Sequence, residues 1–257
     1  MKINNINENI IVGRNSVNEA IRSNRTIDYI LVGNGNISGS ILPIISKAKD
    51  KGIVIKECNP KKLDYMSQNA PHQGIIAVVA AYKYSELDDI FSFAKSKNES
   101  PFIVMAENIE DPHNLGAIIR SAECAGAHGI IIPKRRSSGL TYVVSKASAG
   151  AIEYIPIVRV TNIVSTIGKL KDMGVWVFGA DMAGETWCQT SFSGPVALVI
   201  GNEGYGLSKL VKEKCDNIVS LPLNGSISSL NASVAAGILM YEISRQKHHI
   251  ESINDWT

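Results

Sequence analysis

Residues 102–133, FIVMAENIEDPHNLGAIIRSAECAGAHGIIIP, predict a strand, a turn, a helix and a second strand. FIVMAE and GIIIP are short, mainly apolar runs, which are typical of strands that are buried on both faces. The turn residues DPHN follow the first strand, and Pro112 suits the first turn of the helix. Two strands that are joined through a helix pair in parallel, so this stretch indicates a parallel α/β sheet.

The same alternation of strand and helix continues to the C-terminus. Further strands are expected at residues 154–158, 175–181, 196–201 and 217–222. The helices of this region are expected at residues 113–126, 140–148, 161–173, 206–214 and 230–246. A mostly parallel sheet of this kind carries helices on both faces and binds ligands beyond the carboxyl ends of its strands.

The chain before residue 101 is predicted to form a smaller α/β layer and a linker. Residues 1–82 contain four apolar strand runs, which begin IIVG, DYILV, IVIKE and GIIAVV, with helical patterns between them. Residues 83–100 form a short helical pattern with charge at both ends and a proline behind it, which is typical of a linker. We therefore expect domains at residues 1–82 and 101–257.

The composition is that of an ordinary folded protein and gives no sign of a metal site. Hydrophobic residues make up 45% and charged residues 19% of the 257-residue chain, so we expect buried cores. The four cysteines stand singly, and the five histidines form no ligand pattern. No apolar run approaches the length of about 18 residues that spans a bilayer, and no signal-peptide pattern is found, which favours the cytoplasm.

The charge is unevenly distributed along the chain, although its net value is only +2. Residues 1–80 contain ten Lys and Arg against six Asp and Glu. This excess either keeps the domain soluble or indicates an RNA-binding module, with Arg14 as a candidate contact. A second basic string, Lys134, Arg135 and Arg136, follows the strand GIIIP and is either a phosphate contact or solvated loop charge.

Residues 107–127 place two candidate site residues, Asn114 and Arg120, on a predicted helix. Asn114 lies near the helix start, where asparagine either caps the helix or contacts a ligand. Arg120 lies among small and apolar neighbours, so we expect it to be buried beside an anionic partner. That partner is either a bound anion or Glu203, in a structural ion pair.

Residues 200–208, IGNEGYGLS, place Asn202 and Glu203 between glycines at the end of an apolar strand. Such a strand-to-helix turn exposes backbone N–H groups that hold anions or heteroatoms. The spacing G-x-x-G-x-G differs from the dinucleotide fingerprint G-x-G-x-x-G, and no acidic residue ends a strand about 20 residues later. This pattern argues against NAD as the ligand.

Residues 221–238, LPLNGSISSLNASVAAGI, place several serines and Asn231 before the last predicted helix. One of these polar side chains is expected to cap the helix, and the others, among them Ser229, remain available to a ligand. The first turns of this helix contain alanines and a glycine, and such small side chains allow another helix or backbone segment to pack closely against it. We therefore expect this helix to be deeply buried.

The three polar segments closely resemble the signature motifs of the SpoU (TrmH) family of RNA ribose 2′-O-methyltransferases, within the SPOUT superfamily. The resemblance covers about residues 101–247 and keeps the family's motif order and spacing. The first domain is similar to the L30e-like substrate-binding domain of the RlmB-like branch, most visibly in IVGRNSVNEAI and PHQGIIAVV. Enzymes of that branch methylate a guanosine in 23S ribosomal RNA.

The resemblance implies a deep trefoil knot in the C-terminal α/β domain, bound S-adenosylmethionine and an active site that is completed across a homodimer. The expected partner is 23S rRNA or a pre-ribosomal particle, without membrane or metal. The family's cofactor-binding positions match Gly201, Leu221 and Leu230. The family's catalytic and substrate-binding positions match Asn114, Arg120, Glu203, Ser229 and Asn231.

The family's arginine at the position of Arg120 is often described as the base, yet a guanidinium stays protonated in proteins. We therefore expect Arg120 to hold a phosphate and lower the pKa of the 2′-hydroxyl, while a phosphate oxygen or water takes the proton. Glu203 is expected to orient Arg120 or Asn114. A tRNA ribose methyltransferase, a resistance methyltransferase with another ribosomal target and a non-catalytic L30e-type RNA-binding protein remain as alternatives.

Overall fold

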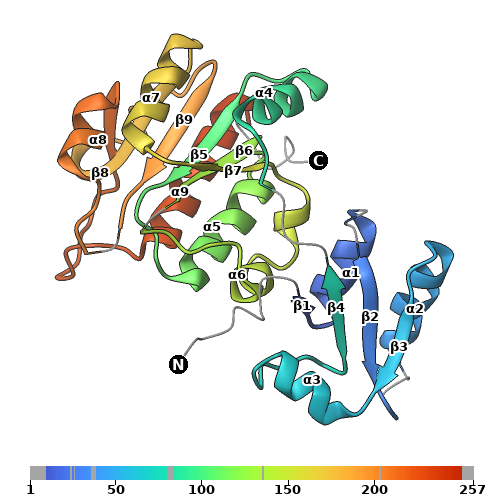
Figure 1. Ribbon diagram of the computed structural model, residues 1–257. Coiled ribbons are helices and arrows are strands. Elements are labelled where there is room, and N and C mark those ends of the chain that lie inside the picture. The colour runs from blue at the N-terminus through green and yellow to red at the C-terminus, as the bar shows by residue number, and fades with distance from the viewer. Residues whose placement is uncertain are drawn as a thin grey trace. The chain divides into compact units, whose positions relative to one another are not determined.

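The computed structural model of this chain forms two compact units, each with its own sheet (Figure 1). It describes residues 10–23, 25, 27–35, 39–79, 84–134, 136–202 and 204–250. The first unit combines Met1–Lys83 with Gly139–Tyr154, and the second combines Tyr84–Ser138 with Ile155–Thr257. Residues 139–154 therefore group with the N-terminal part of the chain, although they follow the first third of the second unit in sequence.

The first unit is a four-stranded sheet in the order β1-β4-β2-β3 with helices on both faces. Among its described strands, β2 and β3 pair in parallel, and β4 runs antiparallel to β1 and β2. Its strands are β1 (Ile10–Val12), β2 (Ile27–Gly33), β3 (Ile55–Cys58) and β4 (Ile75–Val79). Its helices are α1 (Arg14–Arg22), α2 (Ile41–Asp50), α3 (Pro60–Met66), α6 (Tyr142–Ala147) and the 3₁₀ helix η1 (Ala151–Glu153).

Two clusters of buried side chains hold the first unit together, one on each face of its sheet. Val17 and Ile21 from α1 and Ile44 from α2 pack on one face. Leu63 from α3 packs on the other, with Tyr142 from α6 beside it. Helices on both faces bury the alternating apolar side chains of β2 and β4, which explains why these strands are apolar throughout.

The second unit is a fully parallel six-stranded sheet in the order β10-β8-β9-β5-β6-β7. Its strands are β5 (Phe102–Ala106), β6 (Gly129–Pro133), β7 (Ile157–Val160), β8 (Trp176–Thr186), β9 (Val196–Ile200) and β10 (Asn217–Ser220). Its helices are α4 (Leu87–Ser96), α5 (Pro112–Cys124), α7 (Ile163–Asp172), α8 (Lys209–Lys214) and α9 (Ala232–Lys247). The expected α/β architecture with a mostly parallel sheet is therefore confirmed.

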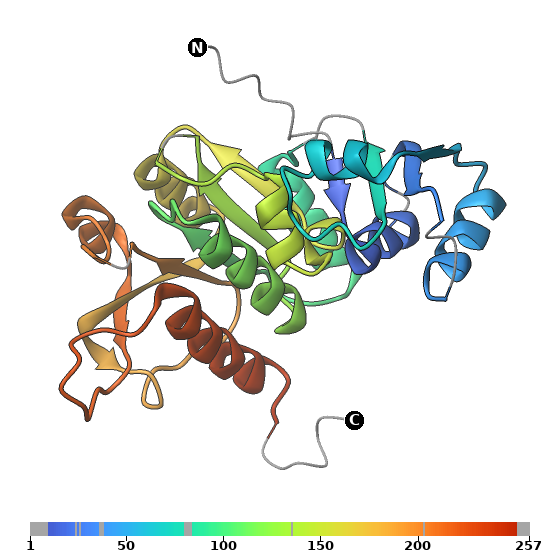
Figure 2. The same ribbon diagram turned by 90° about the horizontal axis from the view of Figure 1, so that it is seen from below.

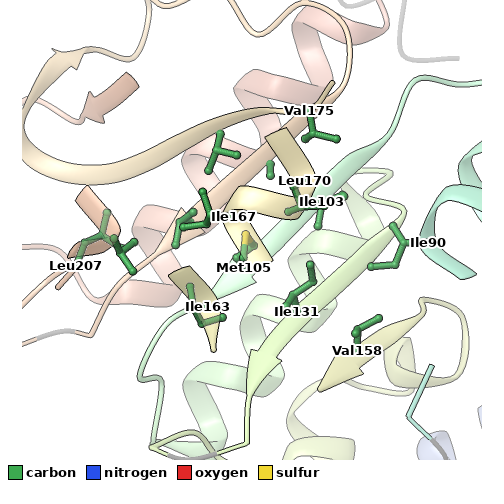
Figure 3. Packing of buried hydrophobic residues seen from close by; sticks show 14 residues of the cluster. Ile90, Ile103, Met105, Ile131, Val158, Ile163, Ile167, Leu170, Val175 and Leu207 are labelled. Carbon is green, nitrogen blue, oxygen red and sulfur yellow. The ribbon is translucent and has the colours of Figure 1, made fainter. Parts of the chain in front are cut away.

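Helices cover both faces of this sheet. Ile90 from α4 and Ile167 from α7 pack against Ile103 and other inward side chains on one face (Figure 3). Val211 from α8 belongs to the same cluster. On the other face α5 and α9 lie side by side (Figure 2). Because α4 belongs to this core, the segment expected to act as a linker packs within the second unit.

Three elements differ from their expected bounds by three residues or more: β7 covers Ile157–Val160 where residues 154–158 were expected, and β8 and α8 differ for local reasons. β8 runs to Thr186, five residues beyond the expected end, because β10 pairs with both of its halves across a register shift. α8 begins at Lys209, because the preceding glycine-rich residues close a tight turn instead of a helical one. Within the described part of the chain, no helix has the length and apolar character that crossing a bilayer requires.

Candidate functional site

A pocket of about 310 Å³ lies at the carboxyl ends of β9 and β10 and beside the middle of β8. Residues that follow β9 and β10 line it, as expected for a parallel sheet that binds its ligand at the carboxyl ends of its strands, and Ala180, Asp181 and Met182 line it from within β8. Gly201, Leu221 and Leu230, the expected cofactor positions, all line this pocket, and so does Ser229. Apolar side chains from the sheet and α9 form its wall: Ile200, Val219 and Leu239.

The glycine-rich turn after β9 is one rigid edge of the pocket. The backbone groups of Asn202 and Gly206 bond to each other twice, with N···O distances of 3.1 and 2.8 Å. A Cβ atom on Gly201 would come within 2.3 Å of the backbone carbon of Gly206. Gly206 itself has a φ of 63°, which favours glycine. Both glycines are therefore needed for the shape of this turn.

Side chains tie this turn to the loop that follows β5. The Asn202 amide accepts a hydrogen bond from the Gly204 N–H at 2.8 Å and donates one to the Asn108 carbonyl at 3.1 Å. The buried Glu107 carboxylate accepts from the Ser208 N–H at 3.1 Å and from the Ser208 hydroxyl at 2.6 Å. Glu107 thus holds the start of α8, and sequence analysis did not single it out.

An ion pair that the sequence analysis also missed borders the pocket. Lys212 Nζ lies 2.6 Å from Asp181 Oδ2, and both residues line the pocket. Asp181 follows the buried part of β8, and Lys212 lies on α8. Among the described lining residues, these two are the charged ones. A carboxylate at the end of the apolar run VWVFGAD was the available signal.

The first and third polar segments meet through two asparagines. Asn231 Nδ2 donates to Asn114 Oδ1 at 3.0 Å. Asn231 also caps α9, because its Oδ1 accepts from the Ser233 N–H at 2.9 Å. Asn114 is buried, whereas Asp111 caps α5 by accepting from the His113 N–H at 2.9 Å. The alternative that Asn114 serves as a helix cap is therefore wrong.

Arg120 is exposed, so the prediction that it is buried was wrong. Its helix α5 is amphipathic: Ile118, Ile119 and Ala122 face the interior, whereas Arg120 and Cys124 lie on the outer side. Arg120 does not line the pocket formed by the described residues. The suggested pair with Glu203 cannot be placed, because Glu203 lies outside the described residues.

The last helix is only partly buried, so the expectation of deep burial was half right. Ala236, Leu239 and Ile243 are buried. In contrast, Val234 and Ile238 are 50% and 38% exposed, and Tyr241, one turn further along the same face, is 44% exposed. α9 therefore has a second apolar stripe that faces away from its own sheet.

The basic string lies at the carboxyl end of β6, at the same edge of the sheet as the pocket. Lys134 and Arg136 are exposed, and neither has a carboxylate partner among the described residues. Arg159 donates to the Lys134 carbonyl at 3.1 Å, which ties the string to β7. Arg135 lies outside the described residues, and the remaining predicted contact, Arg14, lies in the first unit.

Cysteine and histidine side chains form no further site in the described part of the chain. All four cysteines are free, and burial raises the pKa of the Cys215 thiol to about 12, so this group stays protonated. No group of three or more potential metal-binding side chains is found within the described ranges.

Comparisons with known proteins agree with this architecture. Residues 101–241 match the SpoU rRNA Methylase family, and residues 10–85 match the domain described as RNA 2′-O ribose methyltransferase substrate binding. YacO of Bacillus subtilis, assigned to the TrmH family of tRNA/rRNA methyltransferases, is 48% identical over 93% of this chain and 96% of its own length.

Two solved structures illustrate the likeness. The SpoU methyltransferase AviRb of Streptomyces viridochromogenes, in complex with AdoMet, has a TM-score of 0.77 and 26% identity over 92% of this chain and 89% of its own. The TrmH/SpoU tRNA modifying enzyme of A. aeolicus is 27% identical, has a TM-score of 0.53 and covers 59% of this chain and 77% of its own.

The family model spans more than half of the chain, and the three motif segments meet at one edge of the sheet in the SPOUT fold that these relatives share. The chain therefore belongs to the SpoU rRNA methylase family, and it is an RNA ribose 2′-O-methyltransferase that uses S-adenosylmethionine.

Proposed function

We propose that this enzyme methylates the 2′-hydroxyl of a guanosine in 23S rRNA and binds S-adenosylmethionine in the pocket at the carboxyl ends of β9 and β10. The observation that carries this proposal is the convergence of the three motif segments. Two of them line the pocket, and the Asn231–Asn114 hydrogen bond joins the third to them. In this proposal residues 1–82 hold the RNA and residues 101–257 carry the chemistry.

The pocket suits an adenosine-containing ligand. Gly201 has no side chain, and the backbone of Gly206 packs against it, which fixes the turn that forms one edge of the pocket. Leu221 and Leu230 provide apolar surface for a flat base, and the backbone beside them provides polar groups. S-adenosylmethionine supplies an electrophilic methyl group on its sulfonium, and the protein must align the ribose oxygen with it.

The remaining motif residues are proposed to act on the RNA. Arg120 is exposed and well placed to hold a phosphate with its planar guanidinium, which lowers the pKa of the neighbouring 2′-hydroxyl. A phosphate oxygen or water then accepts the proton, because the arginine stays charged. Asn114 and Asn231 fix one another, and Ser229 and Glu203 complete the set.

We propose rRNA and not tRNA as the substrate because of the first unit. The tRNA modifying enzyme named above covers 59% of this chain, whereas AviRb covers 92%. The additional part includes the region that matches a dedicated RNA substrate-binding domain. A large structured RNA offers a second contact region for such a domain, and Lys134, Arg135 and Arg136 are proposed as further phosphate contacts. Action on ribosomal RNA also places the protein in the cytoplasm.

We also propose that the enzyme works as a homodimer through α9. An exposed stripe of Val234, Ile238 and Tyr241 is costly in water and is typical of a surface that a partner covers. A symmetric dimer would bury the same stripe of both copies against each other. It would also bring a second protein surface towards the exposed Arg120 on the neighbouring helix α5.

Transfer of labelled methyl from S-adenosylmethionine tests the function. Unmodified 23S rRNA, 16S rRNA and bulk tRNA are supplied in parallel, and the modified ribose is mapped. We expect label in 23S rRNA and a loss of about a hundredfold or more in Arg120→Ala. Arg22→Ala is the matched control, because Arg22 is an exposed arginine of the first unit that pairs with Glu19.

Each other outcome identifies a different function. Label in tRNA alone would assign the enzyme to tRNA, and label in 16S rRNA alone would assign it to the small subunit. A protein that binds RNA without transferring methyl or binding the cofactor would be a non-catalytic RNA-binding protein. Full activity of Arg120→Lys at neutral pH would refute the need for a bidentate guanidinium.

A further inference from the structure

A polar cleft of about 390 Å³ lies between α1 and α2 in the first unit. Two cations line it, Arg14 and Lys47. The polar side chains beside them are neutral: Asn15, Asn18, Ser40 and Gln73. No carboxylate is found among the described residues that line the cleft. The cleft therefore has a positive charge that its own walls do not neutralise.

Arg14 is held in a fixed orientation by neutral oxygens. Its Nε donates to the Gln73 carbonyl at 3.0 Å, and its Nη1 donates to the Ser40 hydroxyl at 2.7 Å. The Arg14 backbone N–H donates to Gln73 Oε1 at 3.0 Å, so the same glutamine holds both parts of the residue. A guanidinium that is oriented in advance loses less conformational freedom when it binds an anion.

Lys47 is held across the cleft in the same way, because its Nζ lies 3.1 Å from Asn18 Oδ1. In contrast, the other described arginines of this unit form ion pairs with carboxylates. Arg22 pairs with Glu19 at 3.0 Å, and Arg25 pairs with Glu153 at 2.7 Å. Arginines elsewhere in the unit are thus neutralised by carboxylates, whereas the cations of the cleft have no carboxylate partner among the described residues.

We propose that this cleft binds a phosphodiester group of the substrate RNA through Arg14 and Lys47. The proposal rests on the RNA methyltransferase function above and assigns one contact to the first unit. Phosphate suits a guanidinium and an ammonium that converge without a carboxylate. The cleft lies within residues 10–85, the region that matches an RNA substrate-binding domain. The neutral amides of Asn15 and Asn18 add donors for phosphate oxygens or the adjacent sugar.

The test compares RNA affinity of the wild type and the double variant Arg14→Gln, Lys47→Gln over a range of salt concentrations. The probe is an unmodified 23S rRNA transcript. We expect affinity to fall by about tenfold and the slope of log affinity against log salt to become shallower by roughly 1.4 to 1.8. Lys56→Gln is the matched control, because Lys56 is an exposed lysine of the same unit that lies over Tyr29 instead of in the cleft.

Further measurements separate the possible outcomes. Lys47→Gln alone leaves the Arg14 hydrogen bonds intact and should produce about half of the change in slope, even if the double variant unfolds. Affinity for S-adenosylmethionine should be unchanged in every variant. A protein that does not bind this cofactor would contradict the methyltransferase function, whereas an unchanged RNA affinity in the double variant would contradict only the proposed role of the cleft. An RNA affinity and salt slope equal to those of Lys56→Gln would overturn the proposal.

A free phosphate ion shares the chemistry of the RNA backbone and is tested as a competitor. Inorganic phosphate is titrated against the RNA complex at constant ionic strength, with chloride as reference. Weak competition, in the millimolar range or above, is expected if the cleft recognises a phosphodiester within RNA. Tight phosphate binding that is lost in the double variant, with RNA affinity unaffected, would overturn the RNA assignment and identify an ion site.

Discussion

Replacement of Gly201 by alanine should damage both the stability of the protein and its affinity for the cofactor. The added Cβ would lie 2.3 Å from the backbone carbon of Gly206, 2.5 Å from its oxygen and 2.5 Å from the backbone nitrogen of Leu207. These are backbone atoms in a turn closed by two hydrogen bonds, so the clash cannot be relieved by rotating a side chain. The turn itself must move.

The size of the effect follows from this geometry. Overpacking in a rigid site costs about 1 to 3 kcal/mol, and the hydrogen bonds between Asn202 and Gly206 are worth about 1 kcal/mol each. We therefore expect the free energy of unfolding to fall by roughly 2 to 4 kcal/mol. Since the turn is one edge of the pocket, affinity for S-adenosylmethionine should fall by about tenfold or more, which corresponds to about 1.4 kcal/mol.

Urea unfolding measures the stability, and isothermal titration calorimetry measures the affinity for S-adenosylmethionine. Gly168→Ala is the matched control, because Gly168 lies within α7 and its added Cβ would meet no atom within 4 Å. The same substitution there should stabilise the protein by about 0.5 to 1 kcal/mol and leave cofactor affinity unchanged. A Gly201→Ala protein with wild-type stability and affinity would refute the reasoning.

Four further changes test other parts of the structure. Lys212→Ala removes the partner of Asp181 at the pocket and should weaken cofactor binding several-fold in calorimetry, with little loss of stability because the pair is partly exposed; unchanged affinity would remove this pair from the site. Asn231→Ala removes the cap of α9 and should lower the free energy of unfolding by about 1 to 2 kcal/mol, whereas Ser233→Ala should cost less. Burial lowers the pKa of His128 to about 4, so between about pH 4 and 6.5 the unfolded state binds a proton that the folded state does not, and stability should fall as the pH drops through this range; a His128→Gln variant that retains the full pH dependence in urea unfolding would contradict this. Ile238→Asp should convert the proposed dimer to a monomer in light scattering, and a wild-type protein that is already monomeric at micromolar concentration would exclude the dimer.

Much of the architecture was predictable from the sequence because its signals are local. Apolar runs such as FIVMA and GIIIP are buried strands, and the strand-to-helix connections between them require parallel pairing. The placement of three polar segments beyond strand ends followed from the same pattern. The pocket residues Gly201, Leu221 and Leu230 were found through the family resemblance and converge in space.

The errors concern properties that depend on how one helix faces its neighbours. Arg120 was expected to be buried because its sequence neighbours are apolar, yet a helix turns about 100° per residue and presents Arg120 outwards. For the same reason α9 buries Leu239 but exposes Ile238. The amino-acid composition of a helix does not predict which of its faces will be covered by another helix or by the sheet.

The sequence was sufficient for the alternation of elements, the parallel sheet and the edge at which a ligand binds, since these follow from periodicity and from short connections. The pairs that build the site required the folded chain: Glu107 with Ser208, Asn114 with Asn231 and Asp181 with Lys212. So did the grouping of residues 139–154 with the first unit. Each joins residues far apart in sequence, and such contacts depend on the packing of whole elements, which no local pattern encodes.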